Sequence, residues 1–410
     1  MRRRLVVIAV LGALSSPAFS QSSVTLYGIL DAGLNYTVGS QKAIVNGRPV
    51  GAGNQLALND GAFGMFGSRW GLKGTEDLGS GLKAIFTLEN GFSMSSGAFA
   101  QGGAEFGRQA FVGLDSPYGR LTLGRQYDPH LDIVAPFSAA WQFAGYIATH
   151  AADVDNLLST RRLNNSIKYT MPKFHGVNAE ALYSVGGVAG SVSRNQAWSL
   201  AVGYDGGPFQ FGAGYLTINN PNVSFYGANP NGTGVTGNNL GSLGSATSPA
   251  NNPAYAGFAS ANRYNLAGVG ASYTYGSATA GVIYTNVRYT GLGDVATSGP
   301  NPLGYSGTAA INTVELNLRY FFTPTILVGV MGSLTRVGSV GGHDGASYRQ
   351  FGGGAHYFLS KATELYALVM YEHATGVDST GRAAVAAISG LTPSSTSSQT
   401  AVRVGIVHRF

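Results

Sequence analysis

The residues of this sequence that could carry chemistry are basic side chains at alternate positions in apolar segments. Arg69 and Lys73 share one parity, and Lys83, Arg108 and Lys168 stand in the same way in later segments. In an extended chain every second side chain points to the same face. We therefore predict that these five residues line neighbouring strands as one basic wall. Fixed charges of one sign attract ions of the opposite sign, so the chemistry they favour is ion selection.

Further charges gather between residues 128 and 164, a long stretch without a strand pattern. If this stretch folds inward, as a family resemblance given below implies, Asp132, Asp153 and Asp155 would face the basic wall and produce a transverse field at the narrowest point. Arg161 and Arg162 are expected to extend the basic side, where this stretch returns to the next strand. Inward acids nearly equal inward bases in number, so we expect only a modest preference for anions. The alternative is that these are ordinary charges paired with inward acids: Glu89, Glu180, Glu315, Glu364 and Glu372.

The sequence carries no pattern typical of catalysis. No G-x-S-x-G, H-E-x-x-H or P-loop occurs, and the seven histidines do not show metal-ligand spacing. Gly268 and Gly270 lie in a strand pattern without a following helix, which favours close packing over phosphate binding. We therefore expect no enzyme activity, no cofactor and no metal.

The elements that position these residues are read from strict alternation. In INTVELNLRYF, Val314, Leu316 and Leu318 oppose Glu315 and Arg319, and SIKYTM alternates in the same way. A period of two indicates extended strands. An apolar face opposite a polar face is expected where lipid lies outside and water inside.

Sixteen such segments follow one another along the chain. Seven short connections, such as 76–81, 115–119 and 205–208, alternate with eight longer loops. That asymmetry is typical of an outer-membrane barrel. The segments are expected to start near Val24, Ser68, Gly81, Phe106, Arg120, Asn165, Val177, Gln196, Pro208, Arg263, Ala278, Ile311, Thr325, Tyr348, Ala362 and Gln399.

Composition points to the same fold class. Charged residues are 11% of the chain, against roughly 25% in soluble domains. No apolar run reaches about 18 residues, which argues against membrane helices. Lipid offers no partner to unpaired backbone groups, so only a closed barrel remains among spanning structures. We predict an all-β fold, a 16-stranded antiparallel transmembrane β-barrel.

The first twenty residues have the features of a secretory signal peptide. Three arginines precede a ten-residue apolar run, and Ala18 and Ser20 stand at the small-residue positions before a cut. We expect residues 1–20 to be removed and residues 21–410 to form the barrel. Removal leaves 22 basic residues against 19 acids, a net charge near +3 that gives no case for nucleic-acid binding.

The last segment, AVRVGIVHRF, alternates as a closing strand that pairs with the first. Val402 to Phe410 are expected toward lipid and Arg403 toward the interior. Arg125 is the exception to the pattern, because it shares parity with the apolar Leu121 and Leu123. A lipid-facing charge is costly near the midplane. We therefore expect Arg125 to sit at the rim or to contact another subunit.

Several long segments resemble the Gram-negative general porins, in particular those of β-proteobacteria. These are SSVTLYGILDAGLNY, GSRWGLKGTEDLGSGLKAIFTLENGF, GRQAFVGLDSPYGRLTLGRQYDP, NSIKYTMPKFHG and the terminal Phe. The resemblance runs over the expected mature chain and is strongest between 22 and 176.

The resemblance implies a homotrimer in the outer membrane, with lipid around it and a water-filled pore for ions and small hydrophilic solutes in each barrel. It also implies an inward-folded third loop, residues 128–164, without the Pro-Glu-Gly-Gly tip of the enteric porins. Phe410 matches the position that the barrel-assembly machinery reads. A latching second loop, about 93–105, makes Glu105 a candidate partner for Arg125 in another subunit.

Two other functions remain open on the sequence. One is an outer-membrane barrel enzyme of the lipase type, for which His408 is the outward histidine but no Ser or acid is fixed beside it. The other is an adhesin or receptor that acts through loops 219–262 and 376–397. A single-channel current distinguishes a passive pore from either of them.

Overall fold

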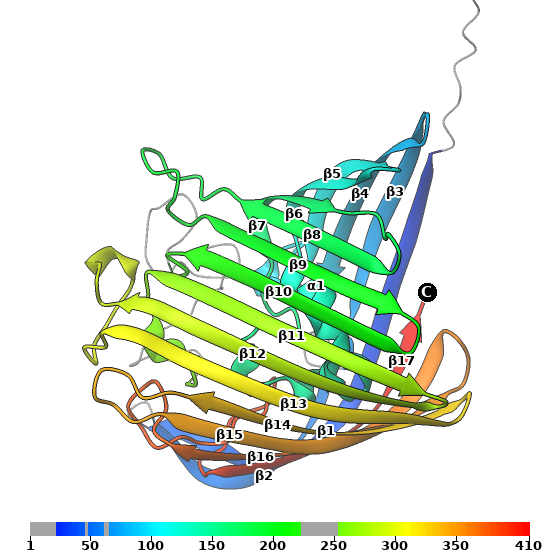
Figure 1. The fold of residues 1–410 in the computed structure, drawn as a ribbon. Helices are drawn as coiled ribbons and strands as arrows, with labels where there is room; N and C mark the ends of the chain where they lie inside the picture. The colour runs from blue at the N-terminus through cyan, green and yellow to red at the C-terminus, as the bar shows by residue number, and fades with distance from the viewer. Residues whose placement is uncertain (1–21, 46–47, 61–64, 223–252) are drawn as a thin grey trace, which may run out of the picture.

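The computed structural model describes residues 22–45, 48–60, 65–222 and 253–410. The expected signal peptide, residues 1–20, and most of the 219–262 loop lie outside the described residues. The described part forms one antiparallel sheet of seventeen strands (Figure 1). The strands are β1 (Ser23–Val45), β2 (Arg48–Asp60), β3 (Arg69–Gly79), β4 (Leu82–Gly91), β5 (Gln109–Ser116), β6 (Gly119–Gln126), β7 (Leu163–Thr170), β8 (Val177–Ser184), β9 (Ala197–Gly206), β10 (Phe209–Asn219), β11 (Arg263–Tyr275), β12 (Ala278–Leu292), β13 (Gly307–Thr323), β14 (Ile326–Val337), β15 (Ala346–Phe358), β16 (Thr363–Gly376) and β17 (Ser398–Arg409).

The sheet closes on itself through β1. One edge of β1 pairs with β17, with Ile29 opposite Arg409, and the other edge pairs with β3 and β2. Gly28 and Phe410 add two backbone hydrogen bonds of 3.0 and 3.1 Å at the seam. Closure supplies partners to backbone groups that an open edge would leave unpaired in lipid.

Seventeen described strands fill sixteen positions around the wall, because β2 and β3 share one position. The second half of β1 pairs with β2 and the first half pairs with β3. The predicted 16-stranded antiparallel barrel is therefore confirmed, and each predicted strand start lies within four residues of an observed one. The sequence did not predict β2.

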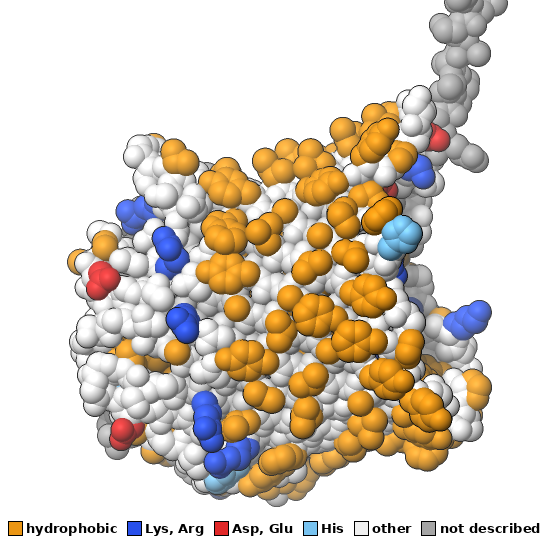
Figure 2. All heavy atoms as spheres, viewed as in Figure 1, with side chains coloured by type: hydrophobic (Ala, Val, Ile, Leu, Met, Phe, Trp, Pro, Cys, Tyr) orange, Lys and Arg blue, Asp and Glu red, His pale blue; other side chains and the backbone are white. Residues whose placement is uncertain are grey.

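The two faces of the wall follow the alternation in the sequence. On β13, Leu316 and Leu318 are 61% and 45% exposed, whereas Thr313 and Glu315 are 1% and 0% exposed. Figure 2 shows the result on one side of the molecule, where hydrophobic side chains form a broad band over the strands. Among the described residues, none of the helices is long and apolar enough to cross a membrane.

Candidate functional site

A long loop between β6 and β7, residues 127–162, lies on the inner side of the wall. It begins with α1 (Pro129–Val134), which contacts β8 to β11 and lies behind them in Figure 1. Further along the loop, the Ala139 amide donates to Glu315 at 2.7 Å, and the Asn317 side chain donates to the Phe137 carbonyl at 2.8 Å. Glu315 and Asn317 belong to the inward face of β13. The loop therefore lies within the barrel.

Inward glycines of β10 and β11 make room for this loop. A Cβ on Gly214 would lie 2.8 Å from the Cα of His130, and a Cβ on Gly270 would lie 2.6 Å from the Phe137 ring. Both distances are too short for any larger residue to be accommodated without movement of the loop. The sequence favoured close packing at Gly270, and the segment that packs there is the loop.

A buried ionic cluster joins the loop to the wall at β12 and β13. The two ring nitrogens of His150 lie 2.6 Å from Asp155 and 3.1 Å from Glu315, and Thr285 donates to Asp155 at 2.7 Å. Burial by itself would lower the pKa of His150, but Asp155 and Glu315 raise it well above its usual value. Burial would raise the pKa of Asp155, but His150 and Thr285 outweigh it and lower the pKa to about 2.

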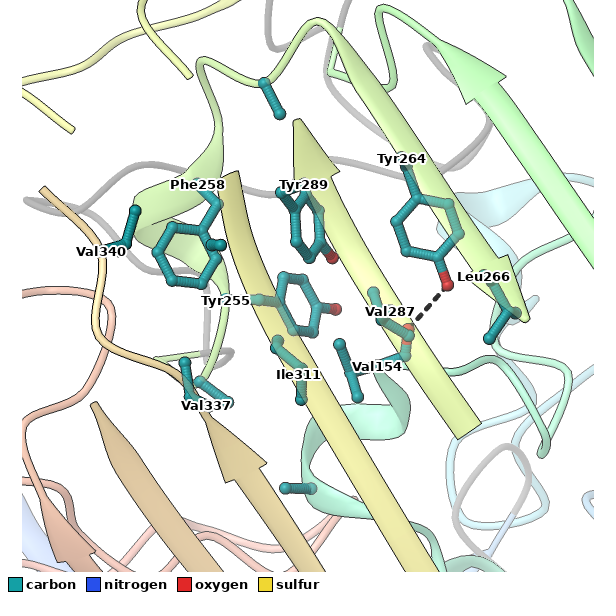
Figure 3. Packing of buried hydrophobic residues seen from close by; sticks show 14 of the residues in the cluster. Val154, Tyr255, Phe258, Tyr264, Leu266, Val287, Tyr289, Ile311, Val337 and Val340 are labelled. Atoms are coloured by element: carbon teal, nitrogen blue, oxygen red, sulfur yellow. Dashed lines mark hydrogen bonds between the residues drawn. The ribbon is translucent and has the colours of Figure 1, made fainter. Parts of the chain in front are cut away.

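Apolar side chains pack on the same side of the barrel interior, closer to the strand ends that carry the long loops. The segment before β11, with η8 (Ala256–Phe258), inserts Tyr255 and Phe258 against Tyr289, at centroid distances of 6.1 and 5.6 Å. Figure 3 shows this cluster, with the Tyr264 hydroxyl donating to the Val154 carbonyl of the inner loop at 2.8 Å. Aromatic contacts of this kind add to the free energy gained by burial.

A cluster of three arginines lies on the opposite side, at β3 to β6: Arg69 on β3, Arg108 directly before β5 and Arg162 at the end of the inner loop. Arg108 donates to Glu89 at 2.8 Å, and Arg69 lies 3.9 Å from the same carboxylate. Arg108 also donates to the Tyr127 hydroxyl at 2.9 Å, and Arg162 lies over the Tyr127 ring at 5.2 Å. Glu89 offsets one of three positive charges, so the cluster keeps an excess of positive charge.

A cavity of about 230 Å³ lies between this arginine cluster and the middle of the inner loop. Arg69, Arg108 and Arg162 line one side, and the loop contributes Trp141 and Tyr146. Charged groups beside a narrow aqueous space act strongly on passing ions, because the protein around them has a low dielectric constant. The geometry can therefore attract small anions to this point.

Lys168 lies beside the cluster but is neutralised. Its ammonium group lies 2.5 Å from Asp132 and 3.5 Å from Glu180. Asp132 therefore forms a direct ion pair with one residue of the predicted basic wall. This pair joins α1 to β7.

Three other predicted residues, Asp153, Asp155 and Arg161, lie elsewhere. The side chains of Asp153 and Asp155 are 2% and 0% exposed and hold the inner loop in place, because their partners are Thr160 and His150. Arg161 is buried against the rings of Tyr255 and Tyr264. Neither Asp153 nor Asp155 therefore pairs with the basic wall across the cavity, and the expected field is not formed by such pairs.

The basic wall is also less continuous than predicted. Lys83 stands opposite Asp77 and Asp115, near the short turns, and Lys73 lies over the Tyr27 ring at 5.3 Å. Neither lysine lines the cavity. The structure brings Arg69 and Arg108 together with Arg162 and separates Lys83 from them, because β4 carries Lys83 and Glu89 at different heights.

Arg125 has partners within its own chain. It donates to the Gly107 carbonyl at 2.9 Å and to the Asn164 side chain. Glu105 is exposed and does not contact Arg125 within one chain. Their contact between subunits stays a prediction, as does the role of Phe410 as an assembly signal.

The sequence missed Tyr127 and His150 as organising residues of the site. Tyr127 joins two arginines, and His150 joins the inner loop to Glu315. Both stand in the loop, where no strand parity indicates direction. In the described part of the chain, no group of three or more His, Cys, Asp or Glu side chains is placed to hold a metal ion.

Comparisons with known proteins agree with this architecture. Residues 7–376 match the family model described as Gram-negative porin. An outer membrane porin protein of Bordetella pertussis is 33% identical over 265 residues, or 58% of this chain and 66% of that relative. Outer membrane porin protein 32 of Delftia acidovorans is 34% identical over 232 residues, or 52% and 59%. The chain thus spans less than two thirds of the length of these relatives.

Two solved structures share the fold at low sequence identity. The anion-selective porin from Comamonas acidovorans has a TM-score of 0.67 and 23% identity over 95% of this chain and 100% of its own. The trimer form of OmpT, an outer membrane protein of Vibrio cholerae, has a TM-score of 0.60 and 14% identity over 95% and 99%.

Proposed function

This chain belongs to the Gram-negative porin family, and on that premise we propose that it forms a water-filled channel for passive diffusion across the outer membrane. Ions and small hydrophilic solutes would pass down their own gradients, without turnover. The closed wall, with an apolar outside and a charged inside, supports this proposal. The Comamonas acidovorans structure, which is described as anion-selective, supports it further.

The observation that carries the proposed selectivity is the cavity between the inner loop and the arginine cluster. Three guanidinium groups lie near one carboxylate there, whereas Asp155 and Asp132 of the loop are paired with His150 and Lys168. An anion in the cavity gains from the excess positive charge, and a cation is repelled. The proposal is a modest preference for anions, because Glu89 and nearby acids offset part of the charge.

We further propose that three copies assemble as a homotrimer. The OmpT structure of Vibrio cholerae, which shares this fold, is described as a trimer form. In a planar bilayer a trimer should insert as a unit and give three equal current steps. Single steps without grouping would favour a monomer.

The test of the channel is a reversal potential across a salt gradient in the same bilayer. We expect an ohmic current with a reversal potential that indicates anion preference. An Arg69→Gln, Arg108→Gln, Arg162→Gln protein should lose that preference, whereas Lys361→Gln, at an exposed turn, should keep it. A silent protein with esterase activity would support the enzyme, and clear cation selectivity would contradict the proposed role of the arginines.

A further inference from the structure

Four arginines stand on the outer face of the barrel, at the ends of strands nearest the long loops. Arg263 belongs to β11, Arg288 to β12, Arg336 to β14 and Arg349 to β15, and all four are exposed. We call them the arginine belt. Figure 2 shows Lys and Arg side chains along the border of the hydrophobic band on this side.

Strand register places the belt at one level of the wall. Arg288 stands opposite Asn265, two residues from Arg263, and Arg336 stands opposite Asn312. Arg349 stands opposite Leu334, two residues from Arg336. Each arginine has the parity of lipid-facing neighbours on its strand, so the four guanidinium groups face outward together.

The belt has no acidic partner among the described residues. None of the four arginines forms a salt bridge in that part of the chain, and the outer face of β11 to β16 carries no Asp or Glu there. Asp294 and Asp344 lie in the adjoining loops and are exposed, but neither pairs with the belt. At the short turns, by contrast, Arg120 pairs with Asp115 at 3.1 Å and Lys173 with Asp205 at 2.7 Å.

An apolar groove lies on the same outer face, below Arg263 and Arg288. It measures about 640 Å³ and crosses β7 to β12. Small side chains, among them Ala213 and Ala267, form its floor, with Tyr284 beside them. Ala267 stands four residues from Arg263 on β11, and Tyr284 four residues from Arg288 on β12. Head and tail of one lipid could therefore be held by the same two strands.

We propose that the arginine belt binds the phosphate groups of a phosphorylated lipid in the leaflet on the long-loop side, with an acyl chain in the groove. A guanidinium group matches phosphate oxygens with two parallel hydrogen bonds, and basic residues at the headgroup level attract anionic lipids. The barrel wall does not need the charges of the belt for its stability, because the backbone groups of its strands are already hydrogen-bonded to one another. That the long loops face the outside of the cell rests on the proposed outer-membrane function.

The test measures binding of diphosphorylated lipid A to the detergent-solubilised full-length protein by native mass spectrometry. Arg263→Gln, Arg288→Gln protein should bind it at least about tenfold more weakly, because two charged contacts are lost. Ala267→Phe, which fills the groove and keeps the arginines, should also weaken binding. The control is Lys173→Gln, Lys361→Gln, which removes the same charge at the short turns and should bind as the unmodified protein does.

Four results would overturn the proposal. The arginine variant could bind as tightly as the control, or dephosphorylated lipid A could bind as tightly as the diphosphorylated form. Low millimolar inorganic phosphate could displace the lipid, which would indicate a site for free anions. The arginine variant could also lose its trimer with lipid binding unchanged, which would make the belt a subunit contact. Channel current recorded on the same variants distinguishes a failure of this proposal from a failure of the proposed channel function. In the arginine variant, lipid binding should fall while the conductance stays unchanged.

Discussion

At the scale of single residues, the balance between Glu89 and the three arginines decides the charge of the passage. Glu89 accepts from both Arg108 and Tyr27, and its side chain is buried. Removing one member of a buried ion pair leaves the other uncompensated. Substitutions on the two sides of this pair should therefore change ion selectivity in opposite directions.

Glu89→Gln should raise the preference for anions, and Arg108→Gln should lower it. A single charge a few ångströms from the path, partly screened by salt, should change the anion-to-cation permeability ratio by a factor of roughly two to five. Reversal potentials in a potassium chloride gradient measure this ratio. Glu76→Gln, at an exposed position near the short turns, is the control. Shifts of the same sign for both variants would argue against the cluster as the selective point.

The inner loop should hold most firmly in mild acid. The pKa of Asp128 is raised to about 6 by burial, so its contribution is present below its ordinary value of 3.8 and is lost as pH rises through 6. The pKa of His150 is also raised, so its contribution to stability is likewise present at low pH and is lost at a higher pH than that of Asp128. The lowered pKa of Asp155, about 2, adds stability above 3.8 that is lost as pH falls toward 2.

Open-channel current noise should therefore be lowest near pH 4. It should rise as the pH increases through 6, and again below about pH 3. Asp128→Asn keeps an acceptor for the Leu131 amide at the start of α1 and should abolish the part of the rise between about pH 4 and 6. Noise that is independent of pH, or unchanged in Asp128→Asn, would show that these carboxyl groups do not hold the loop.

How far the sequence predicted the site depends on where each residue stands. Arg69 and Arg108 were placed inward by strand parity and lie together in the structure. Asp153 and Asp155 stand in the loop, where parity gives no direction, and they turn toward the loop itself and β12. The sequence of a loop does not show which of its charges will be buried by its own folding.

At the scale of elements, the inner loop depends on the glycine face of β10 and β11. Gly270→Leu should push the loop away from this wall, because the added side chain would occupy the place of the Phe137 ring. Moving the loop toward the arginine cluster narrows the cavity, so we expect conductance to fall by roughly half or more, as overpacking forces backbone shifts.

The matched control is Gly332→Ala on the outer face of β14. A Cβ there would lie 3.3 Å from the Phe351 ring and would not touch the loop. Conductance should stay as in the unmodified protein. Equal conductance in the two variants would mean that the loop does not rely on the glycine face.

Strands were predicted well because each has one face toward lipid and one toward the interior. The exception is β2, with Leu56 and Leu58 exposed at 68% and 55%. Most described side chains of β2 are exposed, so no buried face imposed a clear pattern on its sequence. Glycine and asparagine in this segment were typical of a loop, and the strand was missed for that reason.

At the scale of the whole molecule, the barrel is filled unevenly. The inner loop and the segment before β11 pack against β8 to β17, and the described cavity lies against the arginine cluster on the other side. A solute that reaches this cavity meets the arginines on one side and the inner loop on the other. The low charge content of the sequence predicted the barrel, but it could not predict on which side of the interior this cavity would lie.

The central claim is that the outer face meets lipid and the inner face meets water. Because the chain contains no cysteine, single cysteines introduced at Lys73 and at Leu316 can report each face separately. Lys73 is exposed on the inner face of β3, and Leu316 is 61% exposed on the outer face of β13. In lipid vesicles, a charged, water-soluble thiol reagent should modify Lys73→Cys readily and leave Leu316→Cys unmodified. Rapid modification of Leu316→Cys with protection of Lys73→Cys would contradict the account.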